Sequence, residues 1–488
     1  MMRQEEALAV LKTGANVFLT GEPGSGKTHT VNAYTEWLRQ RGVEPAITAS
    51  TGIAATHVGG MTIHAWSGIG VRRDLSAYDL DAIASNKRVH SRVSSASVLI
   101  IDEVSMLSAT ILSMADRVCR EVRRRQEPFG GLQVILVGDF FQLPPISRAE
   151  RGAESMVSHS GEGDFAFQST AWEELNPLSC YLSEQHRQED TRFLALLCAI
   201  RCGRFAEEHK ALLRTRYAKE PKGGVTHLYS HNADVDRLNE SALAALPGKA
   251  REFEMTQRGG GNLVEQLKRG CLSPEILKLK EGARVMFTKN DPAGRFANGT
   301  LGEIVGFEEG TGYPKVRTNV GRTLIVEPAE WTMQDGGKIL ARIAQVPLRL
   351  SWAITVHKSQ GMSLDAAHMD LSGAFEYGQG YVALSRVRTL AGLSIAGLNA
   401  QATAVHPAVA VQDENFREQS ERVRERFAHM PQSELALLQQ RFLAAIGGRE
   451  GAGRKKPKEA AKRQERGATL DTTKELLTRD LSLAEIAQ

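Results

Sequence analysis

Short, almost continuous aliphatic runs predict buried strands in the first third of the chain. Such runs occupy residues 17–19, 98–101 and 133–137, and each suits a parallel strand that is covered on both faces. Residues 28–41 instead show a helical pattern and are followed by Gly42, a residue type that commonly ends helices. This alternation of strand and helix predicts an α/β domain built on a parallel sheet.

A different pattern appears later in the chain. Residues 282–344 contain short alternating apolar and polar segments, separated by turn pairs such as Asn298-Gly299. This stretch predicts an all-β insert. Residues 71–92 are polar, mixed in charge and weakly periodic, so we expect them to form a small inserted element.

The first predicted strand leads into a loop with a phosphate-binding sequence. Residues 21–28 read GEPGSGKT, which fits G-x-x-x-x-G-K-[ST] between a strand and a helix. The glycines let backbone N–H groups turn toward a polyphosphate, while Lys27 reaches the outer phosphates and the Thr28 hydroxyl ligates Mg²⁺. The alternative is an ordinary glycine-rich turn, which would not require the lysine and the hydroxyl. The expected nucleotide contacts here are Gly24, Ser25, Gly26, Lys27, Thr28 and His29.

Two carboxylates follow the second aliphatic run. Asp102 and Glu103 end the sequence SVLIIDE, and the carboxyl end of a central parallel strand lies beside a phosphate loop. Asp102 is therefore predicted to hold Mg²⁺, and Glu103 to orient and deprotonate the attacking water. In the third run, QVILVGDFFQLPP, the amide of Gln142 is placed to detect a γ-phosphate.

Composition limits the classes of protein and of ligand. The formal net charge is only +4, so affinity of the body for nucleic acid must come from a focused patch. The five cysteines include no C-x-x-C pair, which indicates reduced thiols. No run is long enough to span a membrane and no secretory signal begins the chain, so we expect a cytoplasmic, nucleoid-associated protein.

Residues 56–70 offer a candidate surface for single-stranded nucleic acid. The segment THVGGMTIHAWSGIG is rich in Gly, Thr and His and contains one tryptophan. Backbone amides, hydroxyls and a stacking ring suit a polyanion with exposed bases, so Thr62, His64 and Trp66 are predicted contacts. A structural loop is almost equally consistent with this segment.

Several single residues have plain interpretations when they are considered alone. Gln4 and Arg187 would be surface residues, Arg386 an exposed helix charge, and His357 a histidine near the core. The order of the motifs around them changes this interpretation. The chain carries GEPGSGKT, TASTGIAA, GGMTIHAWSGIG, IIDEVSM, GDFFQLPP, LSEQHRQ, ITVHKSQGMSLD and YVALSRVRTL. In that order they resemble the petite-integration-frequency (Pif) family of superfamily-one DNA helicases, over most of residues 1–398.

The resemblance implies roles for individual residues. Gln4 would recognise adenine, Lys27 and Thr28 would bind phosphate and Mg²⁺, and Gln142 would sense the γ-phosphate. Arg187 and Arg386 match arginine fingers from the second RecA-like domain, and Gly361 lies at the nucleotide site. The segments around His64 and His357 resemble the family's contacts to single strands. The predicted DNA contacts outside residues 56–70 are Lys289, Asn290, Arg295, Asn298, His357 and Lys358.

The resemblance also implies a domain organisation. The fold class is α/β, with two RecA-like P-loop NTPase domains. The expected parts are a first RecA-like domain (1–175) with a wedge element at about 71–92, a second RecA-like domain (176–398) with a Src-homology-3-like β insert at about 282–344, and a helical extension (399–448). A basic linker (449–466) carries eight Lys and Arg against three Glu, which predicts a disordered tether. Residues 467–488 resemble a truncated helix-turn-helix module.

The expected function is an ATP- and Mg²⁺-dependent DNA helicase, acting as a monomer at single-strand and duplex junctions. The resemblance implies 5′-to-3′ movement and unwinding of duplexes, and of G-quadruplexes, in replication, repair or telomere maintenance. The alternatives are a RecD-like or relaxase-type helicase, and a P-loop ATPase switch that does not move along DNA. A steep rise of ATP turnover with single-stranded DNA would distinguish a motor from a switch.

Overall fold

The computed structural model describes residues 2–449, except for 59, 71, 73, 146–163, 185–189, 219–224, 231, 292, 294, 297, 320 and 336–337. The first part of the chain forms a six-stranded parallel sheet in the order β3-β2-β4-β5-β1-β6. Its strands are β1 (Val17–Gly21), β2 (Ala46–Ala49), β3 (Met61–Thr62), β4 (Val98–Asp102), β5 (Gln133–Val137) and β6 (Leu178–Leu182).

The central strands of this sheet are buried on both faces. Along β4, Val98 and Ile100 belong to one hydrophobic cluster, whereas Leu99 and Ile101 belong to another. This explains why the strands read as continuous aliphatic runs. Helices α1 (Gln4–Leu11) and α2 (Lys27–Arg39) contribute to the first cluster, and α4 (Ile63–Ser67) and α7 (Ala109–Arg123) to the second. The remaining helices of this part are α3 (Gly52–His57), α5 (Ala77–Ser85), α6 (Lys87–Ser95) and α8 (Thr170–Leu175).

A second parallel sheet follows, in the order β18-β7-β19-β20. Its strands come from distant parts of the chain, because the β-rich segment lies between β7 and β18. Together the two sheets and their helices confirm the predicted pair of α/β units. The elements are β7 (Thr226–Tyr229), β18 (Ala353–Thr355), β19 (Ala367–Leu371), β20 (Leu393–Leu398), α9 (Thr191–Arg201), α10 (Glu207–Arg214), α11 (Asn232–Ala245) and α13 (Gln379–Leu384).

The β-rich segment forms antiparallel sheets. Five strands pair in the order β14-β13-β12-β11-β17, and a long β15-β16 hairpin pairs separately with β9. The barrel form predicted for the insert stays a prediction, as do the domain boundaries. The elements are β8 (Arg251–Glu254), β9 (Thr256–Gly259), α12 (Gly261–Gly270), β10 (Ile276–Leu279), β11 (Arg284–Phe287), β12 (Leu301–Phe307), β13 (Pro314–Thr318), β14 (Thr323–Ile325), β15 (Ala329–Asp335), β16 (Lys338–Gln345) and β17 (Leu348–Leu350).

The weakly periodic stretch at 71–92 overlaps two short helices, α5 and α6. Ser76 and Asp79 form a capping box at the start of α5, and the Asn86 side chain caps α6. Arg92 then donates to the backbone oxygen of Trp66 at 2.6 Å, which attaches α6 to the end of α4. The hydrogen bonds of these capping residues therefore stabilise two helices that the weak hydrophobic periodicity of the sequence does not predict.

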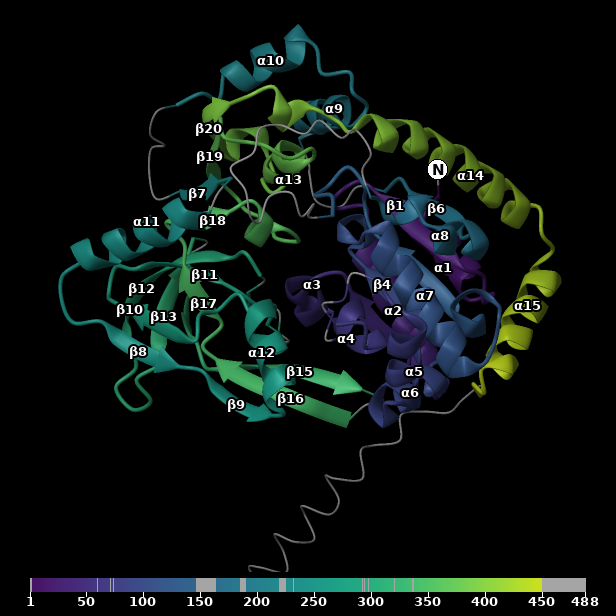
Figure 1. The fold of residues 1–488 in the computed structure, drawn as a ribbon. Helices are drawn as coiled ribbons and strands as arrows, with labels where there is room; N and C mark the ends of the chain where they lie inside the picture. The colour runs from purple at the N-terminus through teal and green to yellow at the C-terminus, as the bar shows by residue number, and fades with distance from the viewer. Residues whose placement is uncertain are drawn as a thin grey trace, which may run out of the picture.

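The chain returns to the first sheet through two C-terminal helices. Helix α14 (Pro407–Ala428) runs along edge strand β6, and α15 (Gln432–Ala445) lies beyond it (Figure 1). Phe416 of α14 enters an aromatic cluster with Phe18, at 4.7 Å between ring centroids. The predicted linker and helix-turn-helix segment lie outside the described residues, apart from residue 449. Among the described residues, no helix has both the length and the apolar character needed to cross a membrane.

Candidate nucleotide site and nucleic-acid interface

The phosphate loop curves tightly between β1 and α2. Gly24 and Gly26 both have φ of 88°, a left-handed conformation that favours glycine. The Lys27 ammonium donates to the backbone oxygens of Gly21 (2.7 Å) and Glu22 (3.1 Å). Lys27 is thus held against the loop in which the sequence placed it.

Gln4 lies directly against this loop. Its side-chain nitrogen donates to the backbone oxygen of Ser25 at 3.4 Å, and its backbone N–H donates to the Glu184 carboxylate at 3.1 Å. A Cβ added to Gly26 would lie 2.2 Å from the Gln4 side chain. Because the two surfaces are in contact, a side chain at position 26 would displace Gln4.

The loop has features that fit a bound polyphosphate. The Ser25 hydroxyl is buried and has no hydrogen-bond partner among the described residues, although buried hydroxyls normally have one. Thr28 and His29 are exposed in the first turn of α2, where helix N–H groups and the helix dipole favour an anion. A nucleoside triphosphate with Mg²⁺ matches this donor set.

The two predicted carboxylates stand together at the carboxyl end of β4. Asp102 accepts a 2.8 Å hydrogen bond from the backbone N–H of Glu103, whose φ of 52° is unusual for a residue other than glycine. Burial raises the pKa of Asp102, although the Glu103 N–H and Lys27 oppose this. Burial and the neighbouring Asp102 raise the pKa of Glu103 to about 7, against the opposing effects of Lys27 and Arg386. A carboxylate with such a pKa is suited to accept a proton near neutral pH.

Glu103 is also in contact with the second α/β unit. The side-chain nitrogen of Gln360 donates to its carboxylate at 3.1 Å. Gln360 belongs to the HKSQG sequence that follows β18, next to Gly361, which has φ of 77°. Glu103, the predicted catalytic residue of the first unit, therefore also accepts a hydrogen bond from the second unit.

Gln142 and Arg386 are both buried, at 7% and 1% exposed. Gln142 donates to Asp139 at 3.3 Å. Arg386 donates to the Val382 backbone oxygen and to the Ser385 hydroxyl, each at 2.8 Å. Its guanidinium therefore contacts its own unit in this conformation, within electrostatic reach of Glu103. The other predicted finger, Arg187, lies outside the described residues.

The segment predicted to contact single-stranded nucleic acid includes strand β3 and helix α4 and is not only a loop. Thr62 caps α4 by accepting from the Ala65 N–H at 3.2 Å, and His64 is partly buried, which lowers its pKa. The Trp66 ring is only 3% exposed and packs in the core. Its burial corrects the stacking role predicted for Trp66. The physical reason is that Met61, Ile63 and Trp66 all face the core of the first unit, which the glycines and polar residues of this segment obscured.

The remaining predicted DNA contacts lie in two groups. In the β-rich part, Lys289 donates to the Glu330 backbone oxygen and its ammonium lies 5.0 Å from the centre of the Trp331 ring. Asn290 accepts from the Asn298 N–H at 2.8 Å, and Arg295 pairs with Asp291 at 2.9 Å.

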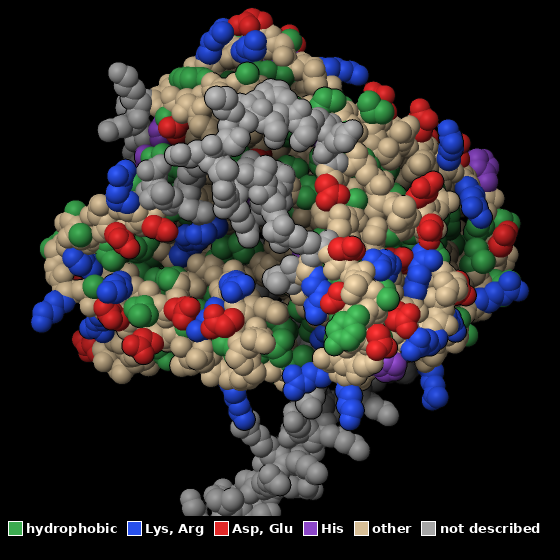
Figure 2. Space-filling view, viewed as in Figure 1, with side chains coloured by type: hydrophobic (Ala, Val, Ile, Leu, Met, Phe, Trp, Pro, Cys, Tyr) green, Lys and Arg blue, Asp and Glu red, His purple; other side chains and the backbone are tan. Residues whose placement is uncertain are grey.

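The second group follows β18. His357 lies 3.3 Å from the Glu376 carboxylate, and burial together with Arg349 lowers the pKa of Lys358. Lys, Arg, Asp and Glu side chains are interspersed on the face shown in Figure 2. This agrees with the small net charge of the chain.

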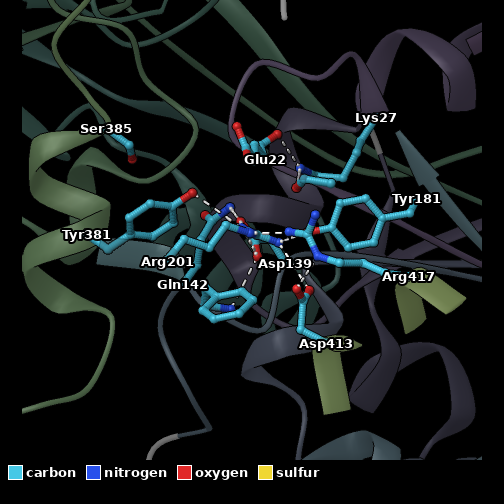
Figure 3. A network of polar contacts seen from close by, with 12 residues as sticks. Glu22, Lys27, Asp139, Gln142, Tyr181, Arg201, Tyr381, Ser385, Asp413 and Arg417 are labelled. Atoms are coloured by element: carbon cyan, nitrogen blue, oxygen red, sulfur yellow. Dashed lines mark hydrogen bonds and ion pairs between the residues drawn. The ribbon is translucent and has the colours of Figure 1, made fainter. Parts of the chain in front are cut away.

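Sequence reasoning missed a buried polar network beside Gln142 (Figure 3). Asp139 accepts from Arg201 at 2.7 Å, although the two residues are 62 positions apart. Asp139 is three residues from Gln142 and was a possible signal, whereas an arginine at the end of a helix resembles a surface charge. The HKSQG sequence indicates a site through His357 and Gly361, but nothing in it distinguishes Gln360 as the partner of Glu103.

Comparisons with known proteins agree with this geometry. The model of the PIF1-like helicase family matches residues 4–211. The chain is 40% identical to the ATP-dependent DNA helicase Pif1 of Psychrobacter sp. (strain PRwf-1), over 100% of this chain and 85% of that protein. It spans about three fifths of the length of the vertebrate proteins that it matches.

Solved structures show the same similarity. The crystal structure of Bacteroides sp Pif1 in complex with ADP-AlF4 has a TM-score of 0.74 and 29% identity, and the match covers 86% of this chain and 97% of that one. Bacteroides Pif1 bound to ssDNA has a TM-score of 0.56 and 30% identity, over 86% of this chain and 98% of that one.

Proposed function

Since the chain belongs to the PIF1-like helicase family, we propose that it is an ATP-dependent DNA helicase that moves along single-stranded DNA. The observation that carries this proposal is the hydrogen bond from Gln360 to Glu103. A motor needs a nucleotide site that changes when two domains move relative to one another. A catalytic carboxylate held from both units provides such a link.

The site residues have complementary tasks in this proposal. Lys27 and the N–H groups of the phosphate loop bind the phosphates, while Thr28 and Asp102 would hold Mg²⁺. ATP supplies the phosphoryl group whose transfer to water releases the free energy for movement. Glu103 accepts the proton of the attacking water, and Gln142 detects the γ-phosphate. Arg386 would turn toward the nucleotide to stabilise charge in the transition state.

The partner in this proposal is single-stranded DNA next to a duplex. Bacteroides Pif1, which is similar to this chain, has been solved bound to ssDNA, and we extend that ligand to this chain. We propose contacts from Thr62, His64, Lys289, Asn290, Asn298, His357 and Lys358, and 5′-to-3′ movement. An intracellular, nucleoid-associated location, a monomeric state and a Src-homology-3-like insert complete the proposal.

A strand-displacement assay tests the function directly. Duplexes with a 5′ or a 3′ single-stranded overhang are incubated with ATP and Mg²⁺, and ATP turnover is measured with and without single-stranded DNA. The proposal predicts steep stimulation by DNA and displacement only from the 5′ overhang. Displacement from the 3′ overhang would contradict the polarity, and turnover that does not respond to DNA would favour a P-loop switch.

A further inference from the structure

Arg201 is the centre of the buried polar network next to the nucleotide site (Figure 3). It ends α9 and is 1% exposed, and one of its terminal nitrogens lies 2.7 and 2.8 Å from the two carboxylate oxygens of Asp139. The same nitrogen donates to the Tyr381 hydroxyl at 3.3 Å, and the other donates to the Tyr181 hydroxyl at 2.7 Å. One side chain therefore joins residues from three separate segments.

These three segments have different positions in the fold. Asp139 lies in the loop after β5 that also carries Gln142, and Tyr181 lies in β6 of the first sheet. Tyr381 lies in α13 of the second unit, five residues before Arg386. Arg201 thus touches both the loop of the predicted γ-phosphate sensor and the helix that leads to the predicted arginine finger.

A second contact joins the same two segments without Arg201. A Cβ added to Gly378, at the start of α13, would lie 2.4 Å from the backbone oxygen of Gln142 and 2.6 Å from that of Phe141. The start of α13 therefore rests directly on residues 141–142. A shift of this loop would push on α13, and the Arg201 network holds the two segments in register.

The C-terminal helix α14 closes the network on its other side. Its Asp413 lies 3.6 Å from Arg201, and its Arg417 donates to the Tyr181 hydroxyl at 2.6 Å. Tyr181 is thus anchored within the first unit and by α14. Arg201 contacts α13 through the Tyr381 hydroxyl.

We propose that Arg201 is a positioning residue that transmits the state of Gln142, through Tyr381, to α13 and hence to Arg386. When Gln142 turns toward a γ-phosphate it gives up its 3.3 Å bond to Asp139. Asp139 and Arg201 then adjust together, because a buried carboxylate and guanidinium stay paired. The Asp139–Arg201 pair carries this adjustment from the first unit to the second, and the Arg201 hydrogen bond to Tyr381 carries it on to α13.

This inference rests on the proposed function, because it assigns an internal link to the ATPase of a motor. Two conservative variants test it as a matched pair. Tyr381→Phe and Tyr181→Phe each remove one hydroxyl that accepts from Arg201, but only Tyr381 belongs to α13. Both variants keep the ring, so packing in the core is preserved.

The first measurement is amide hydrogen exchange of α13 with and without a non-hydrolysable ATP analogue. We expect the analogue to change exchange in residues 379–386 of the unaltered protein and of Tyr181→Phe, but to change it at least threefold less in Tyr381→Phe. An α13 that does not respond to the analogue in the unaltered protein would overturn the inference. So would an equal response in the two variants. This measurement needs nucleotide binding but no helicase activity, so it separates the inference from the proposed function.

The second measurement is ATP turnover at saturating single-stranded DNA. We expect kcat of Tyr381→Phe to fall about tenfold with KM for ATP within twofold, because transition-state and not ground-state contacts are lost. Tyr181→Phe should keep kcat within about twofold. A fall of similar size in both variants would show a merely structural network and would overturn the inference.

Discussion

Gln360 donates a 3.1 Å hydrogen bond to Glu103, and the two residues are 257 positions apart in the chain. One follows a strand of the second parallel sheet, and the other follows a strand of the first. The contact fixes a carboxylate whose backbone is already constrained at φ of 52°. The position of the predicted base therefore depends on how the two units meet.

Replacing Gln360 with alanine tests this dependence. Gln360→Ala leaves the Glu103 carboxylate without its partner from the second unit, so we expect kcat for DNA-stimulated ATP hydrolysis to fall about tenfold or more. ATP affinity should change little, because the hydrogen bond of Gln360 goes to Glu103 and not to the phosphate loop. The matched control is Gln40→Ala, on the exposed end of α2, which should behave like the unaltered protein. Equal rates for both variants would remove Gln360 from the mechanism.

The Glu103→Gln variant tests the base itself. The amide keeps the shape of the carboxylate but cannot accept a proton, so turnover should fall by orders of magnitude while ATP and DNA still bind. Binding is followed by nucleotide and DNA titrations, and turnover by release of phosphate. Hydrolysis at a near-normal rate would mean that a group other than Glu103 accepts the proton of the attacking water.

Arg386→Ala separates a finger from a structural arginine. A finger contributes roughly 10³ to 10⁵ to the rate because it meets charge that develops in the transition state. We expect a loss of that order in turnover with ATP binding retained. Arg388→Ala is the control, since Arg388 is two residues away, exposed and paired with Asp365 at 3.4 Å. If the Arg386→Ala variant hydrolyses ATP but unfolds more easily, the main role of Arg386 is structural, through its hydrogen bonds to Val382 and Ser385.

Acid should weaken the fold through Asp139. Burial is the largest single effect and acts to raise the pKa of this carboxyl, but Arg201, Lys27 and the hydrogen bond from Gln142 together hold the pKa below its ordinary value. A group with a lowered pKa in the folded state stabilises the protein above its unfolded pKa, and this contribution is lost as the pH falls through the folded pKa. Asp139→Asn should therefore be less stable at pH 7, and its deficit should shrink as the pH falls below about 3.9, the ordinary pKa of an aspartate. Urea unfolding from pH 7 to about pH 2 measures both, and a deficit independent of pH over this range would contradict the ion-pair argument.

Much of the nucleotide site could be predicted because its chemistry is local in sequence. The phosphate loop needs glycine, lysine and a hydroxyl at fixed spacing, and Asp102 with Glu103 directly follows an aliphatic strand. Trp66 and Arg201 could not be predicted in the same way. Whether a tryptophan stacks on a ligand or fills a core depends on which helices pack around it in the folded protein. The role of Arg201 depends on its partners in β6, α13, α14 and the loop after β5.

The last prediction concerns the return of α15 to the first unit. The ring of Phe442 packs on Gly14, where an added Cβ would lie 2.2 Å from it, and Gln439 donates to the Ala9 backbone oxygen at 3.2 Å. Phe442 is half-buried, so Phe442→Ala should lower the free energy of unfolding by about 1–3 kcal/mol, less than a fully buried phenylalanine would. Leu437→Ala, on the same helix but 45% exposed, should change it by less than about 0.5 kcal/mol. Chemical denaturation measures both variants. Equal and small effects would mean that α15 does not stay attached to the first unit in solution.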